Sequence, residues 1–158
     1  MLTRRIFHIG VLSLGAAAFP GAAGGQQGDT VTVRIRADES VRAAIPPIAQ
    51  GHLTIKPDQS EEANDLARRV PPGRALPVIF IIVGAIAATV LLQMIKELLR
   101  QVYYGGVLID ARSQPPIVTS DPKIPANMIF VIDAEGKTTQ FTNDQFSLDV
   151  LKGVLKMT

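Results

Sequence analysis

The chain of 158 residues, 47% of them hydrophobic, has the size and apolar content of one domain with a core of its own. Its formal net charge of only +2 comes from Arg4 and Arg5, and basic and acidic residues balance in 24–74 and in 96–158, so the sequence indicates no basic face for nucleic acid. The absence of cysteine excludes disulfides, a lipoprotein anchor, thiol catalysis, cysteine-ligated zinc and iron–sulfur clusters.

Residues 1–23 have the layout of a secretory signal peptide. A short basic region with Arg4 and Arg5 precedes an apolar stretch from Ile6 to Ala18, and small residues follow a helix-breaking proline. Cleavage after Ala23 fits this pattern best, with cleavage after Ala18 as the alternative. The paired arginines also resemble the twin-arginine export signal, although an ordinary positive region would serve general secretion. We therefore expect a protein exported across the inner membrane of a bacterial-type cell envelope.

Residues 24–74 are predicted to form a small β/α segment. Polar and apolar residues alternate from Thr30 to Arg36, which is typical of a strand with one buried face. Leu53 and Ile55 repeat the alternation and are expected to pair with that strand. The chain between them, at Ile45-Pro46-Pro47, is expected to be an extended connection.

A helix is predicted from Glu61 to Val70. Asp58 or Ser60 precedes it as a potential N-cap, its first turn is acidic and its last turn is basic, as the helix dipole favours. The following Pro71-Pro72-Gly73 is expected to end it.

The run from Ala75 to Ile95 contains no charged side chain and meets the length of about 20 apolar residues that a membrane-spanning helix needs. Hydropathy therefore predicts one apolar helix over 75–103, a single transmembrane span with the membrane as its partner. Pro77 lies where the start of a helix tolerates proline. The middle of the run has small residues that would let another transmembrane helix approach closely: Gly84, Ala85, Ala87, Ala88 and Thr89.

Two observations favour an alternative. Arg68, Arg69 and Arg74 would flank the outer end of the span, against the rule that positive residues stay inside. The span would also divide the chain into two pieces too small to form secure cores. The alternative is a soluble exported α+β domain in which 76–103 is a buried strand plus a helix.

In this alternative the strand runs from Val78 to Val83 and the helix from Ala85 to Val102. The helix would turn four apolar residues toward the sheet: Leu91, Ile95, Leu98 and Val102.

Residues 104–158 are predicted to form a β-hairpin plus a helix. Val107 to Asp110 is typical of a buried strand, and four prolines between 115 and 125 predict irregular, extended chain. Met128 to Ile132 and Lys137 to Phe141 flank a turn that ends in Gly136, which favours a hairpin. A final helix, with Asn143 or Asp144 as its cap, is expected to pack on the hairpin through one apolar face: Phe146, Val150, Leu151, Val154 and Leu155.

The stretch from Ile124-Pro125 through the hairpin to the final helix resembles the last third of thioredoxin-like proteins, in which a proline precedes such a hairpin. The resemblance covers a short part of the chain, and without cysteine it implies no redox chemistry. We interpret it as turn chemistry shared by two hairpins, and it implies no site residue.

No motif in the sequence predicts a catalytic, cofactor-binding or metal site. His52 is the only histidine that remains after removal of the signal peptide with His8, and one histidine does not form a metal site. A turn explains Asp133 and Glu135. Three further features match no binding motif: the pair Gly105-Gly106 lacks the rest of a phosphate loop, and Tyr103 and Tyr104 have no basic groove beside them.

The sequence therefore predicts an α+β fold: a small mixed sheet with a C-terminal β-hairpin and helix, plus one long apolar helix that is transmembrane. The predicted function is that of a non-enzymatic, membrane-anchored cell-envelope protein that acts by binding a protein partner, without cofactor, metal or nucleic acid. The alternative is the soluble exported domain, in the periplasm or secreted. A small hydrolase that uses His52 is a third hypothesis.

Overall fold

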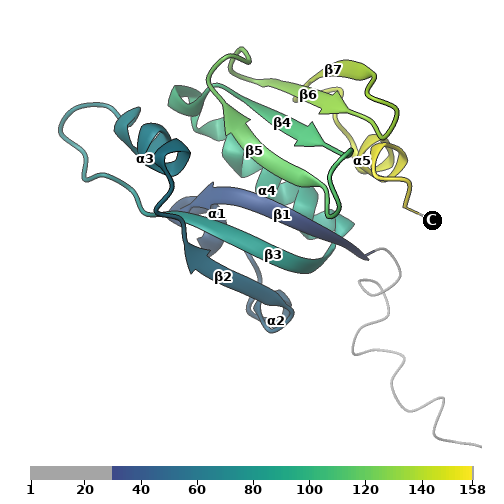
Figure 1. The fold of residues 1–158 in the computed structure, drawn as a ribbon, viewed down its shortest axis with the longest axis horizontal. Coiled ribbons are helices and arrows are strands. Elements are labelled where there is room, and N and C mark those ends of the chain that lie inside the picture. The colour runs from purple at the N-terminus through teal and green to yellow at the C-terminus, as the bar shows by residue number, and fades with distance from the viewer. Residues whose placement is uncertain (1–29, 158) are drawn as a thin grey trace, which may run out of the picture.

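The computed structural model describes residues 30–157, and they form an α+β fold built on one mixed sheet of seven strands (Figure 1). The predicted signal peptide lies outside the described residues. The strands are β1 (Thr30–Asp38), β2 (Leu53–Pro57), β3 (Ile79–Ala87), β4 (Gly106–Asp110), β5 (Ile117–Asp121), β6 (Met128–Ile132) and β7 (Thr138–Thr142). The helices are α1 (Glu39–Ala43), α2 (Pro47–Gln50), α3 (Glu61–Arg68), α4 (Ala88–Arg100) and α5 (Leu148–Val154), with a 3-10 turn, η2, at Val102–Tyr104.

The strand order is β2-β3-β1-β5-β4-β6-β7. Strand β3 pairs antiparallel with β1 on one side and with β2 on the other. Strand β1 then pairs in parallel with β5, and this contact joins the N-terminal strands to the C-terminal ones in a single sheet.

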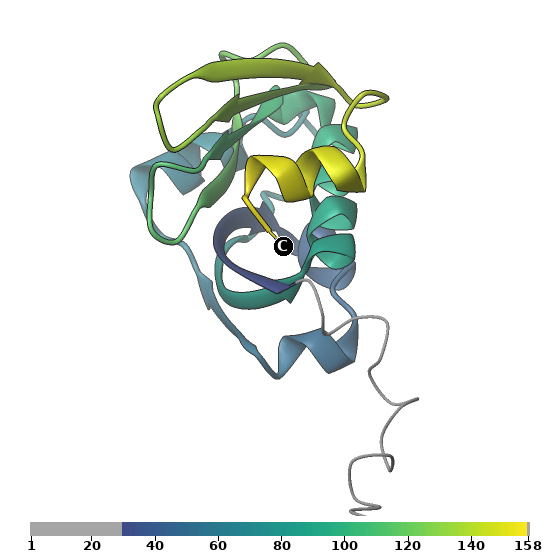
Figure 2. The ribbon, with the colours of Figure 1, turned by 90° about the vertical axis from the view of Figure 1, so that its right-hand side faces the viewer.

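Helices α1, α4 and α5 lie on one side of the sheet (Figure 2). Helix α4 is central because it contacts β1, β3 and β4 as well as the two other helices. The main core lies between this layer and the sheet and includes the fully buried Ile35, Ile82, Ile86, Leu91, Met94, Ile95, Leu98, Ile109, Ile129 and Phe146. Helix α3 lies on the opposite side, where Ala63, Leu66 and Ala67 pack with Ile79 and Tyr104.

The apolar run does not form one long helix, so the prediction of a helix over 75–103 is wrong. Its first part is strand β3 and its second part is helix α4. The β-branched residues at the start of the run favour a strand. Strand β3 pairs with β1 along its whole length and with β2 from Phe80 to Gly84, and this pairing supplies hydrogen-bond partners for its backbone. Among the described helices, none combines the length and the apolar character that crossing a bilayer requires.

The alternative interpretation of this run is close to the structure. Leu91, Ile95 and Leu98 of α4 are buried against the sheet, as that interpretation predicts. Val102 differs, because the helix ends at Arg100 and Val102 lies in the 3-10 turn with 64% of its surface exposed.

Gly84 has a structural role that differs from the predicted one. The sequence suggested that its small size would admit another transmembrane helix. In the structure a β-carbon at this position would clash with the carbonyl oxygen of His52, so the missing side chain lets the start of β2 approach β3.

Most of the other predicted elements are confirmed, with corrected details. Strand β2 forms as predicted but pairs with β3 rather than with β1. The connection between β1 and β2 is not extended, because it contains α1 and α2. Strand β5 forms between the prolines, where no strand was predicted.

The C-terminal hairpin and helix are also confirmed. Strands β6 and β7 pair antiparallel, and the turn between them places Gly136 at a φ of 87°, a conformation that suits glycine. Ser147, rather than Asn143 or Asp144, caps α5 by accepting a hydrogen bond from the Val150 N–H. Phe146 packs on Phe141 of the hairpin, with the ring centroids 5.5 Å apart.

Candidate functional site

The residues singled out in the sequence do not come together in a catalytic site. His52 is exposed in the turn before β2. Asp133 organises the hairpin turn by accepting hydrogen bonds from the N–H groups of Glu135 and Lys137, and Glu135 pairs with Lys156. Within residues 30–157 there is no cluster of three or more His, Asp or Glu side chains that would hold a metal ion.

Gly105 and Gly106 have a packing role. A β-carbon at Gly106 would clash with the side chain of Ile124 and with nearby carbonyl oxygens, and a β-carbon at Gly105 would clash with the carbonyl oxygen of Asp121. The pair therefore lets two segments of backbone approach closely.

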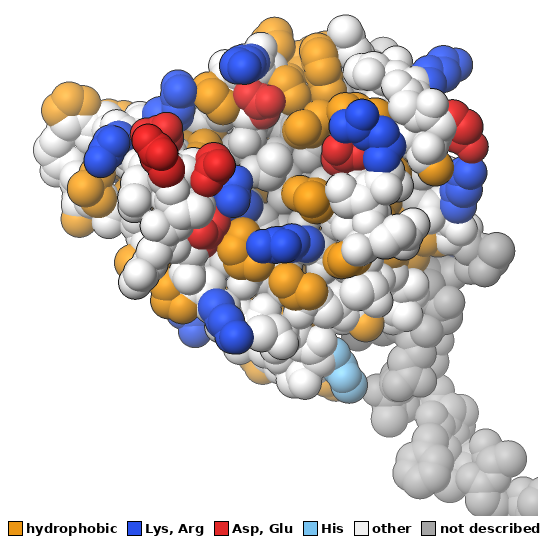
Figure 3. Space-filling model, viewed as in Figure 1, with side chains coloured by type: hydrophobic (Ala, Val, Ile, Leu, Met, Phe, Trp, Pro, Cys, Tyr) orange, Lys and Arg blue, Asp and Glu red, His pale blue; other side chains and the backbone are white. Residues whose placement is uncertain are grey.

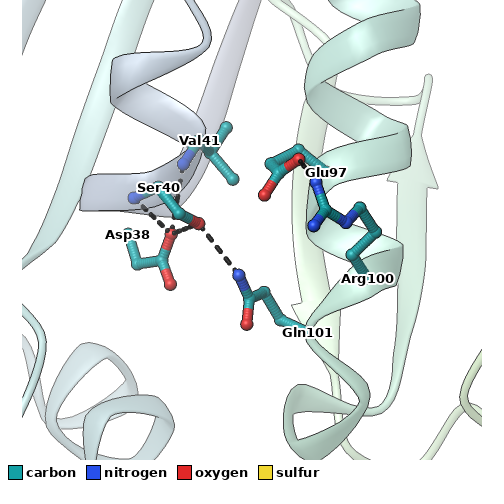
Figure 4. A network of polar contacts seen from close by, with 6 residues as sticks. All are labelled: Asp38, Ser40, Val41, Glu97, Arg100 and Gln101. Atoms are coloured by element: carbon teal, nitrogen blue, oxygen red, sulfur yellow. Dashed lines mark hydrogen bonds and ion pairs between the residues drawn. The ribbon is translucent and has the colours of Figure 1, made fainter.

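Tyr104 is buried and its hydroxyl donates a hydrogen bond to Asp38. Asp38 is itself buried and caps α1, since its Oδ1 accepts hydrogen bonds from the Ser40 and Val41 N–H groups and from the Ser40 hydroxyl. The Gln101 amide extends this network to Ser40 (Figure 4). Every member has a partner inside the fold, so we assign the network a structural role.

The surface that distinguishes this molecule is the side of the sheet opposite α4. We call it the open face and define it by the outward side chains of three adjacent strands: Thr32, Arg34 and Arg36 of β1, Thr54 and Lys56 of β2, and Ile81, Val83 and Ala85 of β3. The alternation of side chains along each strand sets this arrangement, because the residues between them, such as Val33, Ile35 and Ile82, point into the core.

An apolar strip runs along the middle of the open face. It consists of Ile81, Val83 and Ala85, of which the first two are half-buried and the last is exposed. The strip ends at Ile79, which α3 covers. Strand β3, the second strand from one edge of the sheet, therefore exposes apolar side chains on the side that α4 does not cover.

Basic side chains border the strip on both sides. The register places Ile81 beside Arg36 of β1 and beside Lys56 of β2, and it places Val83 beside Arg34 and Thr54. Figure 3 shows this side of the molecule, with basic side chains lying among hydrophobic ones over the sheet.

Among the described residues, only one of these basic groups has an acidic partner. The Arg36 Nε donates a hydrogen bond to Asp58 Oδ2 at 2.7 Å. Burial by itself would raise the pKa of Asp58, but hydrogen bonds from Ser60 and Arg36 lower the pKa below its ordinary value. Arg34 and Lys56 are exposed and form no ion pair with any residue from 30 to 157, so their charges are free to meet a partner.

The surface is hollowed at this place. A shallow depression of about 380 Å³ is lined by the two free basic residues, the two apolar residues beside them and the end of β2: Arg34, Lys56, Ile81, Val83, Thr54, Pro57 and Asp58. It therefore combines an apolar floor with a positive border, an arrangement typical of a docking surface.

A larger hollow, of about 650 Å³, lies where the start of β1 meets the end of α5. Its lining is mostly apolar side chains, proline and threonine, and Lys156, the one charged residue among the described residues of the lining, pairs with Glu135. It offers no set of polar groups that would orient a ligand.

No family model, characterised protein or solved structure matches the chain. The open face is therefore the strongest candidate site on the described residues, and the case for it rests on its own geometry. Sequence reasoning missed it because Arg34 and Lys56 are 22 positions apart and the charge balance of the segment hides them. The pairing of both β1 and β2 with β3 brings them together.

Proposed function

We propose that the chain is an exported, non-enzymatic domain of the cell envelope that binds a protein partner on the open face of its sheet. The observation that carries the proposal is the half-exposed apolar strip of β3 with free basic groups on both borders. Exposed apolar surface surrounded by polar groups is costly to leave in water, and in folded domains it marks interaction sites. The proposal keeps the export expected from residues 1–23 and takes 76–103 as a strand and helix of the core.

The position of helix α4 supports the proposal that the open face, and not the opposite face of the sheet, binds the partner. The side that faces α4 is closed by buried leucine and isoleucine side chains and has a structural role. The open face has the same strands but arginine, lysine and threonine between its apolar residues. One face of the sheet thus has the purely apolar side chains of a core, and the other has the mixture of apolar and polar side chains that is typical of a binding surface.

Site-specific photo-cross-linking in the producing cells tests the proposal. A photoreactive amino acid replaces Thr32 or Thr54 on the open face or, as a matched control, Gln93 on α4; all three positions are exposed. We expect one discrete protein adduct from each open-face position and none from Gln93. A folded, exported protein that gives no adduct from Thr32 or Thr54, or the same adduct from Gln93, would overturn the proposal.

A further inference from the structure

The dimensions of the open face match those of a helix. Strands β1 and β2 lie on either side of β3, so their basic side chains stand two strand spacings apart, or roughly 10 Å. An α-helix with its side chains has a diameter of about 10–12 Å. A helix lying along β3 would therefore cover the apolar strip and reach both borders.

Resting on the proposed function, we infer that the partner presents an amphipathic helix with an apolar stripe and carboxylates along both edges of that stripe. The stripe lies on Ile81 and Val83. The carboxylates on one edge meet Arg34, and those on the other edge meet Lys56. Arg36 adds positive charge on the first border, although Asp58 partly compensates it.

An extended segment fits less well. The side chains of a single strand that face one surface form one row, so a strand lying on β3 would not place acidic groups on both sides of an apolar row. A helix does so because residues three and four positions apart share a stripe and their neighbours flank it.

Charge also argues against a second copy of the same chain. Two open faces brought together would add the free charges of Arg34 and Lys56 from both copies in one interface, with only Asp58 as acidic compensation near the depression. Burying like charges in this way disfavours the complex.

The length of the strip sets the length of the helix. From Ile81 to Ala85 the strand advances four residues, or roughly 13 Å, which corresponds to about nine residues of helix. Helix α3 closes one end, where it covers Ile79. A partner helix of about three turns is therefore sufficient to fill the open part of the strip.

Two synthetic helical peptides with the same leucine stripe test the inference. One has glutamate along both edges of the stripe and the other has lysine there. Each is titrated into the ¹⁵N-labelled exported protein. We expect the glutamate peptide to shift the amide signals of β1, β2 and β3, and higher salt to weaken its binding.

Variants of the protein then test the two charges. The double variant Arg34→Gln with Lys56→Gln should weaken binding of the glutamate peptide about fivefold, the scale of two exposed ion pairs. A double variant with the same loss of charge away from the site, Arg74→Gln with Lys137→Gln, should bind like the original protein.

The other outcomes of these experiments separate a wrong partner helix from a wrong binding face. If the lysine peptide binds at β1–β3 as tightly as the glutamate peptide or more tightly, the inference of an acidic partner helix is overturned. The proposal that a partner binds on the open face is then unaffected. Absence of shifts at β1–β3 with either peptide would also overturn the inference, while the cross-links from Thr32 and Thr54 decide the proposed function separately. Shifts of these signals with protein concentration alone would assign the face to a second copy and overturn the acidic partner.

Discussion

The hydroxyl of Tyr104 donates a hydrogen bond to Oδ2 of Asp38, 3.2 Å away and 66 positions earlier in the chain. This contact joins the turn after α4 to the end of β1, and the other oxygen of the same carboxylate caps α1. The buried carboxylate of Asp38 thus connects the end of β1, a strand of the open face, to helix α1 and to the turn after α4.

Replacement of Tyr104 by phenylalanine should lower the free energy of unfolding by about 1.5–3 kcal/mol, because a buried carboxylate oxygen loses a hydrogen-bond donor. Chemical denaturation measures this change. As a control, Tyr103→Phe should have a smaller effect, since the described residues give Tyr103 no comparable bond to a carboxylate. Equal stability of Tyr104→Phe and the original protein would contradict the assigned role of the bond.

The same bond predicts a dependence of stability on alkaline pH. Burial, and then the charge of Asp38, raise the pKa of Tyr104 above its ordinary value of 10.0. The folded state therefore keeps the proton where the unfolded state loses it. This contribution is complete below pH 10.0 and falls as the pH rises above it. Melting curves of the original protein should show a steeper alkaline loss than those of Tyr104→Phe.

Asp58 predicts the opposite dependence at acid pH. Hydrogen bonds from Ser60 and then from Arg36 lower its pKa in the folded state, so these interactions of the carboxylate contribute fully above the ordinary value of 3.8. As the pH falls below that value the unfolded state takes up a proton first, and stability is lost. Asp58→Asn should flatten this acid limb in thermal melts. Asp65→Asn, at the exposed pair with Arg68, should not, and equal acid limbs in all three proteins would contradict the assignment.

Gly84 tests the approach of β2 to β3. Gly84→Ala should lower the free energy of unfolding by about 2 kcal/mol or more, because its β-carbon would clash with the backbone carbonyl oxygen of His52 and the backbone would have to shift. Gly51→Ala is the control, since nothing lies within 4 Å of a β-carbon there. Denaturation of both variants measures the difference. A harmless Gly84→Ala would show that β2 is not held against β3 as described.

Local patterns were sufficient to predict much of this fold. Alternation identified β1 and β2, a capped and dipole-matched sequence identified α3, and turn chemistry identified the β6–β7 hairpin. Each of these signals is complete within a few neighbouring residues. The pairing partner of a strand, in contrast, depends on residues far away in the sequence, and β2 was therefore assigned to β1 instead of β3.

The apolar run shows where local patterns are insufficient. Strand β3 has apolar side chains on both faces, with Phe80 and Ile82 inside and Ile81 and Val83 outside, so it shows no alternation. Helix α4 follows without a break, and its first charged residue is Lys96. A strand and helix of this kind have the same hydropathy as a membrane span. The candidate site was hidden for the related reason that the sheet order alone places Arg34 and Lys56 on opposite borders of β3.

The predicted export is tested at the N-terminus of the chain. Mass spectrometry should find a mature N-terminus at Gly24 or close by, as cleavage after Ala23 predicts. Replacing Arg4 and Arg5 by lysine should abolish export if the twin-arginine route is used, because that receptor reads guanidinium groups, and should leave general secretion intact. An unprocessed N-terminus on protein recovered outside the cytoplasm would contradict the signal peptide.

The most direct test of binding on the open face combines cross-linking with one substitution in the apolar strip. Val83→Asp places a carboxylate between the free basic groups and removes part of the apolar floor; circular dichroism first establishes that the variant folds. The photoreactive group at Thr54 should then lose its adduct, while Gln93→Asp on α4 should leave that adduct unchanged. An undiminished adduct from a folded Val83→Asp protein would contradict the claim that the partner binds on the open face.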